Sequence, residues 1–397
     1  MIYRIEIWSR LTGAALPVGE MICEIGETGR GRGSFRYDRQ FLERGDAFAL
    51  DPVSLPLGPE TFSVEHPGIF GVFEDSLPDD WGRRLLIRKH NLSRNRQNLP
   101  SLLLALGSSG LGALSYSEGG KPGDPPNDTS TMHLSALVQA AEQFERGEIR
   151  DPMLSLLLGA GSSPGGARPK SLVFDEKCGV HYIAKFPSIR DQVDVVRIEA
   201  GTMALAARAG LKIPPTKLVP CGGRVALLVE RFDVTPRGRR HMISLQTLLK
   251  AHGYYQCRYL DILNIVRKYS AAPLEDSEEL FRQMVFNAVI GNTDDHLKNF
   301  WMIHDHLAGW RLSPSFDLLP DVGRNGEHVL FFDLGGYYPG RMTLEKLGRS
   351  WGIRRADRVV EEVYGALSVW KDVFSVAGVP DEEIAGFSEI DTRLEER

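Results

Sequence analysis

Two short segments of the sequence carry side chains that could handle protons and metal ions. Residues 291–300 read GNTDDHLKNF, and residues 312–317 read LSPSFD. Asp294 precedes Asn299 by five positions, and a second carboxylate, Asp317, follows downstream. Phosphoryl transfer to a hydroxyl needs such a set, because one carboxylate accepts the hydroxyl proton while the other two side chains bind magnesium on the phosphates. The spacing therefore predicts a kinase catalytic centre with Asp294 as the base and with Asn299 and Asp317 as metal ligands.

A helix, a loop and a strand must hold these side chains. Residues 280–290 are apolar enough for a buried helix, and Gly291 tolerates the left-handed conformation that ends one. Residues 300–303 (FWMI) predict a buried strand, so the polar residues between form a loop. Such loops are often purely structural. Asp295 is accordingly interpreted as a solvated residue or a ligand contact, and His296 as a nucleotide contact or a hydrogen-bonded structural histidine.

A glycine-rich stretch lies upstream, where residues 158–171 read LGAGSSPGGARPKS. The bare backbone at Gly165 and Gly166 could approach phosphates closely. The stretch is not a Walker A loop, because Pro169 stands where that motif has glycine and removes an amide donor. A linker or turn is the alternative interpretation. The segments that follow favour the interpretation as a phosphate-binding loop.

Those segments predict the rest of a nucleotide site. Residues 181–187 (HYIAKFP) form an alternating strand with one lysine, Lys185, comparable to the strand lysine that binds phosphates in kinases. Glu199 opens a helical pattern, where it could orient Lys185 or lie exposed in the first turn. Residues 225–229 (VALLV) predict a buried strand that leads into Glu230, and backbone groups at its end could bind the adenine edge.

Together these motifs resemble the HipA-type serine/threonine kinases, the toxins of bacterial toxin-antitoxin pairs, over nearly the whole chain. The N-terminal residues 73–82 (FEDSLPDDWG) are similar to a family block as well, although Asp80 and Trp81 stand where a glycine is frequent. The most specific matches are residues 293–300 (TDDHLKNF), 312–317 (LSPSFD), 229–233 (VERFD) and 163–170 (SPGGARPK).

The resemblance implies roles for individual positions, with ATP and Mg²⁺ as cofactors. Lys185 would bind phosphate, and residues 230–233 would form the nucleotide-binding hinge. Within that hinge, Glu230 leads into Phe232, which would pack against the adenine, and Asp233, which would lie near the ribose. Asp294, Asn299 and Asp317 keep the roles that their spacing predicts.

The resemblance also implies self-modification and partners. Ser163 matches the family's autophosphorylated loop serine, and adjacent Ser162 is the alternative position. The implied partners are a HipB-type helix-turn-helix antitoxin and a protein substrate, with an aminoacyl-tRNA synthetase as the suggested target. DNA would be contacted only through the antitoxin.

Composition limits the remaining possibilities. The chain has 397 residues and a net charge of −5, so no general positive field would draw it onto nucleic acid unaided. Its four cysteines are scattered without zinc-like spacing and predict reduced thiols in a cytoplasmic protein. Residues 1–8 alternate like a strand rather than a signal peptide, and no apolar run is long enough to span a bilayer.

The pattern of elements predicts an α+β chain with a two-lobed, protein-kinase-like fold. It divides into an N-terminal α+β subdomain (residues 1–116), a polar linker (117–131), a nucleotide-binding lobe (132–236) and a mainly helical catalytic lobe (237–397). Two other functions stay open. One is a catalytically weak, nucleotide-binding corepressor partner of a DNA-binding antitoxin, and the other is a small-molecule phosphotransferase of the aminoglycoside type.

Overall fold

The computed structural model describes residues 1–26, 29–125, 128–148, 157, 168–253, 256–305, 307–333 and 335–396. The chain forms two compact units, each assembled from separate stretches of sequence. The first unit comprises Met1–Ser188, Glu230–Ile243 and Ile303–Ala308, and the second comprises Ile189–Val229, Ser244–Met302 and Gly309–Arg397.

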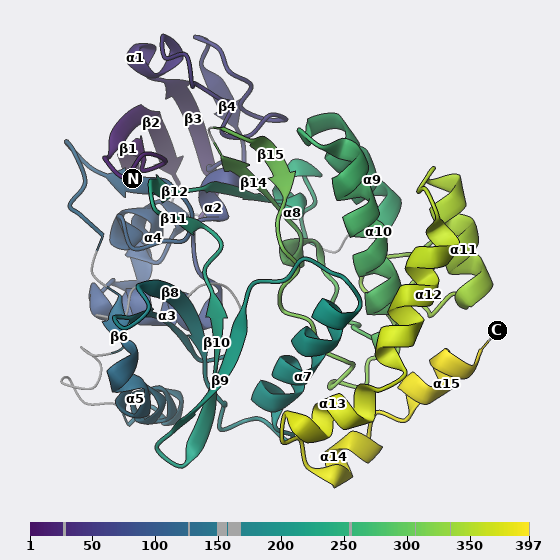
Figure 1. Ribbon diagram of the computed structural model, residues 1–397. Helices are drawn as coiled ribbons and strands as arrows, with labels where there is room; N and C mark the ends of the chain where they lie inside the picture. The colour runs from purple at the N-terminus through teal and green to yellow at the C-terminus, as the bar shows by residue number, and fades with distance from the viewer. Residues whose placement is uncertain are drawn as a thin grey trace. The chain divides into compact units, whose positions relative to one another are not determined.

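The N-terminal part of the first unit is an antiparallel sheet in the order β4-β3-β2-β1-β5 (Figure 1). Strand β1 alternates as predicted, because Ile5 and Ile7 are fully buried while Arg4, Glu6 and Trp8 reach solvent. Its register sets Ile5 opposite Met21 on β2. The elements are β1 (Ile2–Ser9), β2 (Leu16–Ile25), β3 (Gly31–Tyr37), β4 (Phe62–Val64), β5 (Leu114–Ser117), α1 (Arg39–Leu42), α2 (Gly71–Glu74), α3 (Asp80–Lys89), η1 (Arg94–Arg96) and α4 (Leu99–Leu106).

The rest of the first unit carries the strand predicted around Lys185. Strand β6 (Thr129–Ser130) pairs in parallel with β7 (Lys170–Asp175), which pairs antiparallel with β8 (Val180–Lys185). Helix α5 (Leu134–Arg146) precedes these two longer strands. The remaining elements are η2 (Thr131–His133), the hairpin of β11 (Val234–Thr235) and β12 (Gly238–Arg239), and most of β13 (His241–Ser244) and β14 (Trp301–Asp305).

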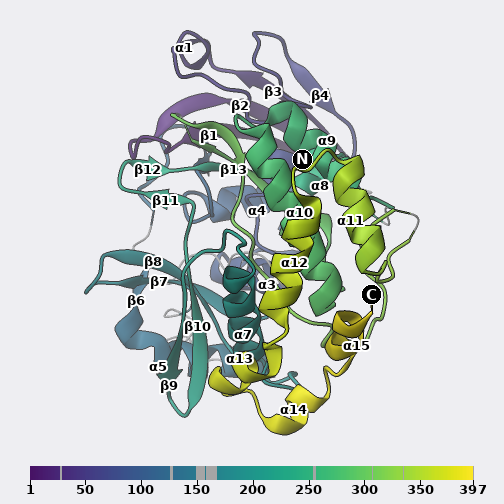
Figure 2. The same ribbon diagram turned by 45° about the vertical axis from the view of Figure 1, so that its right-hand side comes forward.

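The second unit is mainly helical around α10 (Pro273–Ile290), which packs against α9 (Tyr259–Tyr269) and α12 (Ala356–Leu367), as Figures 1 and 2 show. Every residue of α10 from Phe286 to its end is buried, and Gly291 follows in the left-handed conformation. The predicted helix end is therefore confirmed. The other elements are the hairpin of β9 (Thr216–Cys221) and β10 (Arg224–Glu230), α7 (Val195–Arg208), α8 (Leu245–Leu248), η3 (Leu297–Asn299), β15 (Gly309–Leu312), α11 (Arg341–Ser350), α13 (Trp370–Val376), α14 (Asp381–Ala385) and α15 (Glu389–Glu395).

Helix α7 begins earlier than the sequence pattern suggested. Asp194 caps it, because its carboxylate accepts a hydrogen bond from the Arg197 backbone N–H at 3.0 Å. Glu199 consequently lies in the second turn and is only 4% exposed. The interpretation of Glu199 as an exposed first-turn residue is wrong, since the apolar face of the helix already starts at Val195.

The described residues include no helix that is both long enough and apolar enough to cross a membrane. All four cysteines are unpaired thiols, as expected. Burial raises the pKa of the Cys23 thiol to about 12, which suits an inert core residue.

Candidate active site

The predicted catalytic loop lies in the second unit and starts at Gly291. Its φ of +75° belongs to the left-handed region, and a Cβ placed there would collide with the guanidinium of Arg393. Glycine is therefore favoured on conformational grounds, and any other residue would in addition have to displace the tip of the Arg393 side chain. Residues 292–296 follow as an irregular segment, and η3 then carries the chain through Asn299 into β14.

Asp294 and Asn299 are brought together by one hydrogen bond. The Nδ2 atom of Asn299 donates to the backbone carbonyl of Asp294 at 2.8 Å. Because a carbonyl oxygen only accepts, this contact assigns the amide nitrogen of Asn299 and leaves its Oδ1 atom as an acceptor that this bond does not use. The side chain of Asp294 is itself 75% exposed, as a base that must reach a substrate hydroxyl requires.

His296 lies beside the candidate base. Its Nε2 atom is 3.8 Å from Oδ1 of Asp294, and about a third of its side chain is exposed. That distance is too long for a direct hydrogen bond but short enough for an ionic interaction when the imidazole is protonated. The contact places His296 beside Asp294, the candidate catalytic base, while its predicted role toward nucleotide stays a prediction.

Asp317 belongs to the same unit and has an unusual backbone. Its φ of +57° lies in the left-handed region, where a non-glycine residue is strained, and such strain concentrates at functional sites. Two residues earlier, the backbone N–H of Ser315 donates to the Lys212 carbonyl at 2.8 Å, which ties this segment to the chain after α7. Asp317 is partly buried.

Sequence reasoning missed a further acidic residue near this segment, Asp321. Its carboxylate accepts hydrogen bonds from the backbone N–H groups of Asn325 at 2.9 Å and Gly326 at 2.7 Å. Burial opposes its ionisation, but these two bonds and one from the Thr293 hydroxyl bring its pKa below the usual value. Asp321 thereby links the catalytic loop to the segment after Asp317. Its spacing from Asp317 was the only available signal in the sequence.

The oxygen ligands of Asn299 and Asp317 suit magnesium. This ion is usually bound by one or two protein carboxylate or amide oxygens, with water and substrate phosphates completing its octahedron. Among the described residues no three His, Cys, Asp or Glu side chains form a protein-only metal cluster.

Asp295 differs completely from its neighbour Asp294. It is fully buried and accepts four hydrogen bonds, from the Tyr259 hydroxyl, the His328 ring and two backbone N–H groups. The interpretation of Asp295 as a solvated turn residue is wrong. No local pattern could have revealed this, because two of its partner segments lie more than thirty positions away in the sequence.

In the first unit, Lys185 lies at the end of β8 and has an unexpected neighbour. The register of β7 and β8 sets Lys170 directly opposite it, so that both lysine side chains project from the same face of the sheet. Lys170 is 6% exposed. The position of Lys170 opposite Lys185 makes it a second candidate phosphate ligand. Lys170 ends the segment 163–170 on which the family resemblance partly depends and is the first residue of β7, but no role was predicted for it.

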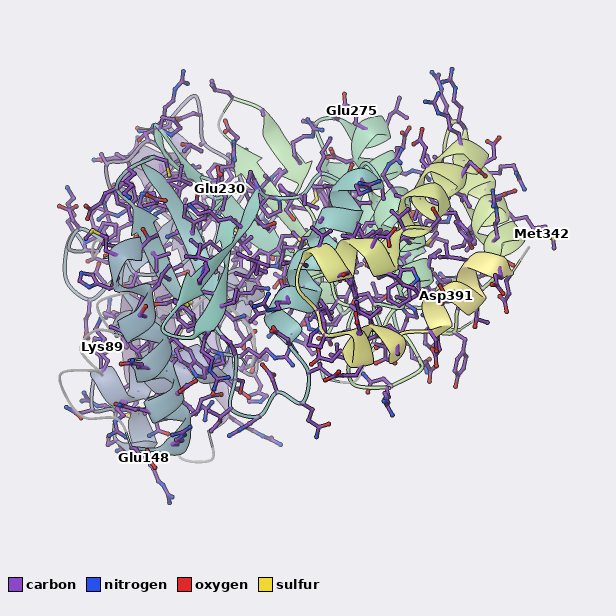
Figure 3. All side chains as sticks on the ribbon, turned by 60° about the horizontal axis from the view of Figure 1, so that its bottom comes forward. Lys89, Glu148, Glu230, Glu275, Met342 and Asp391 are labelled. Carbon is purple, nitrogen blue, oxygen red and sulfur yellow. The ribbon has the colours of Figure 1, made fainter. Side chains whose placement is uncertain are left out.

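The hinge candidates follow strand β10, which ends at Glu230 (labelled in Figure 3). The backbone N–H of Arg231 donates to the carbonyl of His181 at 2.9 Å, so the first unit holds the hinge segment against the start of β8. Phe232 is half-buried, and its carbonyl accepts a 2.6 Å bond from the guanidinium of Arg240.

Asp233 is engaged in a buried ion pair. Its two carboxylate oxygens accept bonds of 3.0 and 2.8 Å from Arg231, and the Gly112 backbone N–H adds a third bond of 2.8 Å. Arg231 also pairs with Asp128 at 3.3 Å, and its side chain is fully buried. Burial opposes ionisation of Asp233, but the charge and hydrogen bonds of Arg231 lower its pKa to about 2. Its role toward the ribose stays a prediction, which would require it to exchange these partners.

The glycine-rich loop cannot be placed in the same way. Ser163, Gly165 and Gly166, together with the alternative Ser162, lie outside the described residues. Their roles toward phosphate and in autophosphorylation remain predictions.

Comparison with known proteins decides the family. A profile described as the HipA N-terminal domain matches residues 16–117, and one described as the HipA-like C-terminal domain matches residues 162–370, more than half of the chain. The chain belongs to the HipA family. Both halves of the resemblance seen in the sequence are thereby confirmed.

HipA relatives support the same assignment. Two proteins of Sinorhizobium fredii, Y4mE and Y4dM, whose names describe them as kinases, are each 28% identical to this chain. The match to Y4mE spans 77% of this chain and 76% of the relative, and the match to Y4dM spans 63% and 62%. The HipA chain in a structure of the Shewanella oneidensis HipA, HipB and operator DNA complex superimposes with a TM-score of 0.69 at 18% identity, covering 98% of this chain and 95% of that chain. This likeness confirms the predicted protein-kinase-like α+β fold.

Proposed function

We propose that this HipA-family chain is an ATP-dependent serine/threonine protein kinase and the toxin of a toxin-antitoxin pair. The observation that carries the proposal is the geometry of the catalytic loop. It presents the exposed carboxylate of Asp294 and ties the Asn299 side chain to the same turn through the bond from its amide nitrogen to the Asp294 carbonyl, so that the amide oxygen is not used in this bond. A turn with a purely structural role needs neither feature.

Each side chain then has one task. Asp294 accepts the proton of the substrate hydroxyl as that oxygen attacks the terminal phosphorus of ATP and the bond to the leaving ADP breaks. Asn299 and Asp317 hold Mg²⁺, which neutralises charge on the phosphates when bound. Lys185 and Lys170 bind phosphate oxygens, and the β7–β8 register sets these two residues opposite each other. The chain supplies positioning and electrostatic stabilisation rather than a covalent intermediate.

Recognition of the nucleotide base is assigned to the hinge. Backbone groups of residues 230–232 bind the adenine edge, and the half-buried Phe232 packs against its face. The bond from Arg240 to the Phe232 carbonyl fixes the backbone there. Asp233 binds the ribose when it exchanges its bonds to Arg231 for bonds to the nucleotide. While it keeps its bonds to Arg231, it stabilises the hinge segment.

The proposed substrate is a protein hydroxyl, with an aminoacyl-tRNA synthetase as the target class, so that phosphorylation halts translation and growth. Incubating the purified chain with labelled ATP and Mg²⁺ in a bacterial lysate, followed by identification of the labelled protein, tests this directly. Label in small metabolites rather than in protein would indicate a small-molecule phosphotransferase. The complete absence of transferred label would favour the corepressor role.

Self-limitation through the glycine-rich loop is part of the proposal. Phosphorylation of Ser163, or of Ser162, would add about −1.5 to −2 charges near bound nucleotide phosphates and so repel the nucleotide. Mass spectrometry after incubation with ATP should find the modified loop in the wild type but not in the Asp294→Asn variant. Equal modification of both would show that another kinase is responsible.

The proposed partner is a small, dimeric HipB-type antitoxin. The structural neighbour from Shewanella oneidensis is described in complex with HipB and operator DNA. The net charge of −5 gives this chain no general attraction to DNA, so the antitoxin would supply the DNA-binding surface. A gel-shift assay should show operator binding by the complex only. Specific binding by this chain alone would contradict the assignment.

A further inference from the structure

We propose that Asp295 is a positioning residue, whose buried carboxylate locks the catalytic loop to residues 328–332 and thereby aims Asp294 and Asn299. This inference rests on the proposed kinase function, but the contacts that carry it belong to the second unit alone. It assigns a task to a residue that the chemistry itself does not use.

The carboxylate of Asp295 has four partners, two at each oxygen. Its Oδ2 atom accepts a 2.6 Å bond from the Tyr259 hydroxyl and lies 3.1 Å from Nδ1 of His328. Its Oδ1 atom accepts bonds from the backbone N–H groups of Val329 at 2.9 Å and Leu330 at 3.2 Å. Three of the four donors come from residues 328–330, so the Asp295 carboxylate holds this short segment against the catalytic loop.

The lock continues into the helix that precedes the loop. The Tyr259 hydroxyl accepts a 3.0 Å bond from Nδ2 of Asn287, near the end of α10. The Oδ1 atom of Asn287 in turn accepts a 3.1 Å bond from Nδ2 of Asn292, the second residue of the loop. Burial and the adjacent Asp295 charge raise the pKa of Tyr259 far above its usual value, so the phenol stays protonated and donates.

Backbone bonds and rings hold the docked segment from its other side. The Phe331 N–H donates to the Cys257 carbonyl at 2.9 Å, and the Tyr259 N–H donates to the Phe331 carbonyl at 3.1 Å. The ring of Phe332 stacks on Tyr259 at 5.5 Å, and His328 meets Phe332 edge-on at 4.9 Å. The segment is therefore an ordered part of the unit.

Asp295 and Asp294 are neighbours with opposite exposure, so a buried residue can fix the position of an exposed one. Asp295 is 0% exposed while the side chain of Asp294 is 75% exposed. Rotation of the loop that moved Asp294 would pull Asp295 away from its four donors and leave a buried charge uncompensated, which is strongly unfavourable. Asn299 follows the same constraint, because its amide is bonded to the Asp294 carbonyl.

The test compares Asp295→Asn with Asp276→Asn, a matched control in the same unit. Asp276 is also buried, at 2% exposure, and accepts bonds from the Ser270 hydroxyl, the Leu312 N–H and the Arg311 guanidinium. Its role is structural in either case. With folded fractions equalised, Asp295→Asn should lower kcat at least about tenfold and change KM for ATP less than threefold, whereas Asp276→Asn should leave both within about twofold.

Tyr259→Phe gives a second variant in case Asp295→Asn does not fold. It keeps the ring that packs on Phe332 and removes one hydrogen bond, so kcat should fall about fivefold, the equivalent of one lost bond. A kcat within twofold of wild type in Tyr259→Phe and in folded Asp295→Asn, or equal losses in Asp295→Asn and Asp276→Asn, would overturn the inference.

Hydrogen exchange separates this inference from the proposed function. The amides of Val329 and Leu330 should be protected in the wild type, and they and residues 292–299 should exchange faster in Asp295→Asn but not in Asp276→Asn. If the wild-type chain shows this exchange pattern but transfers no phosphoryl group, the kinase function is contradicted and the positioning role of Asp295 stands. If the wild type is active but hydrogen exchange is unchanged in Asp295→Asn, the kinase function stands and the positioning role of Asp295 is contradicted.

Discussion

Two buried aspartates in different units, Asp295 of the catalytic loop and Asp233 of the hinge segment, are stabilised by different chemistry. Asp295 receives bonds from a phenol, an imidazole and two backbone amides. Asp233 instead forms a two-bond ion pair with the fully buried Arg231, with one backbone amide in addition. Both carboxylates lie next to residues predicted to act on nucleotide.

The two regions differ in whether the buried aspartate is itself the residue predicted to act on the ligand. In the catalytic loop the buried carboxylate belongs to Asp295, so that its neighbour Asp294 stays exposed for chemistry. In the hinge the buried carboxylate belongs to the very residue that the family resemblance assigns to the ribose. A charged partner also makes the hinge pair sensitive to loss of either member, because an unpaired buried charge is costly. We therefore expect mutations to affect activity in one region and stability in the other.

The largest effect should come from Asp294→Asn. Loss of the general base should lower turnover by roughly 10²–10⁴-fold while the fold and ATP affinity persist, because the side chain is mostly exposed. Steady-state phosphorylation assays beside a thermal melt measure both quantities. The exposed control Asp372→Asn should leave turnover unchanged. Wild-type turnover in Asp294→Asn would remove this residue from the mechanism.

Arg231→Ala should act on the hinge through stability. Removing Arg231 leaves Asp233 with the Gly112 N–H and Asp128 with His181 but takes the buried cation from both, at a cost of about 3–5 kcal/mol. Urea denaturation, followed by a probe in the first unit, should show the shifted midpoint. The exposed Arg237→Ala, from the neighbouring turn, serves as the control and should stay within about 0.5 kcal/mol of wild type. A similarly small shift in Arg231→Ala would mean that the pair contributes no net stability.

Asp317→Ala should change nucleotide binding rather than stability. A lost carboxylate leaves the metal under-coordinated, so the affinity for ATP in the presence of Mg²⁺ should fall at least about 10–100-fold. Titration calorimetry with and without Mg²⁺ distinguishes the contribution of metal coordination to the ATP affinity from the contribution of direct nucleotide contacts. If the wild type bound ATP equally well without Mg²⁺, Asp317 would have no role as a metal ligand.

The pH dependence of stability should be set by His241 over a window in which Asp233 does not titrate. Burial lowers the pKa of His241 to about 3, with a smaller contribution from His304 and an opposing one from its bond to the Leu50 carbonyl. A folded pKa below the unfolded value of about 6.5 means that its stabilisation is complete above pH 6.5 and is lost as the pH falls toward 3. Asp233, with a pKa of about 2, loses its contribution only below its unfolded pKa of 3.8.

The free energy of unfolding should therefore fall by up to about 1.4 kcal/mol per pH unit between pH 6 and pH 4.5. Denaturation of His241→Gln across this range should show a flatter dependence than the wild type. The control His252→Gln, at an exposed position, should keep the wild-type slope. Identical slopes in all three proteins would show that His241 does not titrate as its burial implies.

Much of the local structure followed from sequence patterns. The alternation of residues 1–8, the apolar residues before Gly291 and the run of residues 225–229 correspond to β1, α10 and β10. Each is a short-range signal, because residues of one strand or helix share a face at a fixed period. The start of α7 was missed because the capping carboxylate of Asp194 lies outside the periodic pattern.

The sequence by itself determined which side chains could perform phosphoryl transfer, because the spacing of Asp294, Asn299 and Asp317 is a property of the chain. It also determined the HipA resemblance, which the family profiles confirm. Only the tertiary structure decided which of two adjacent aspartates is exposed and which is buried. That choice depends on Tyr259 and His328, donors that lie about 35 positions away on either side of Asp295 and reach its carboxylate only through folding.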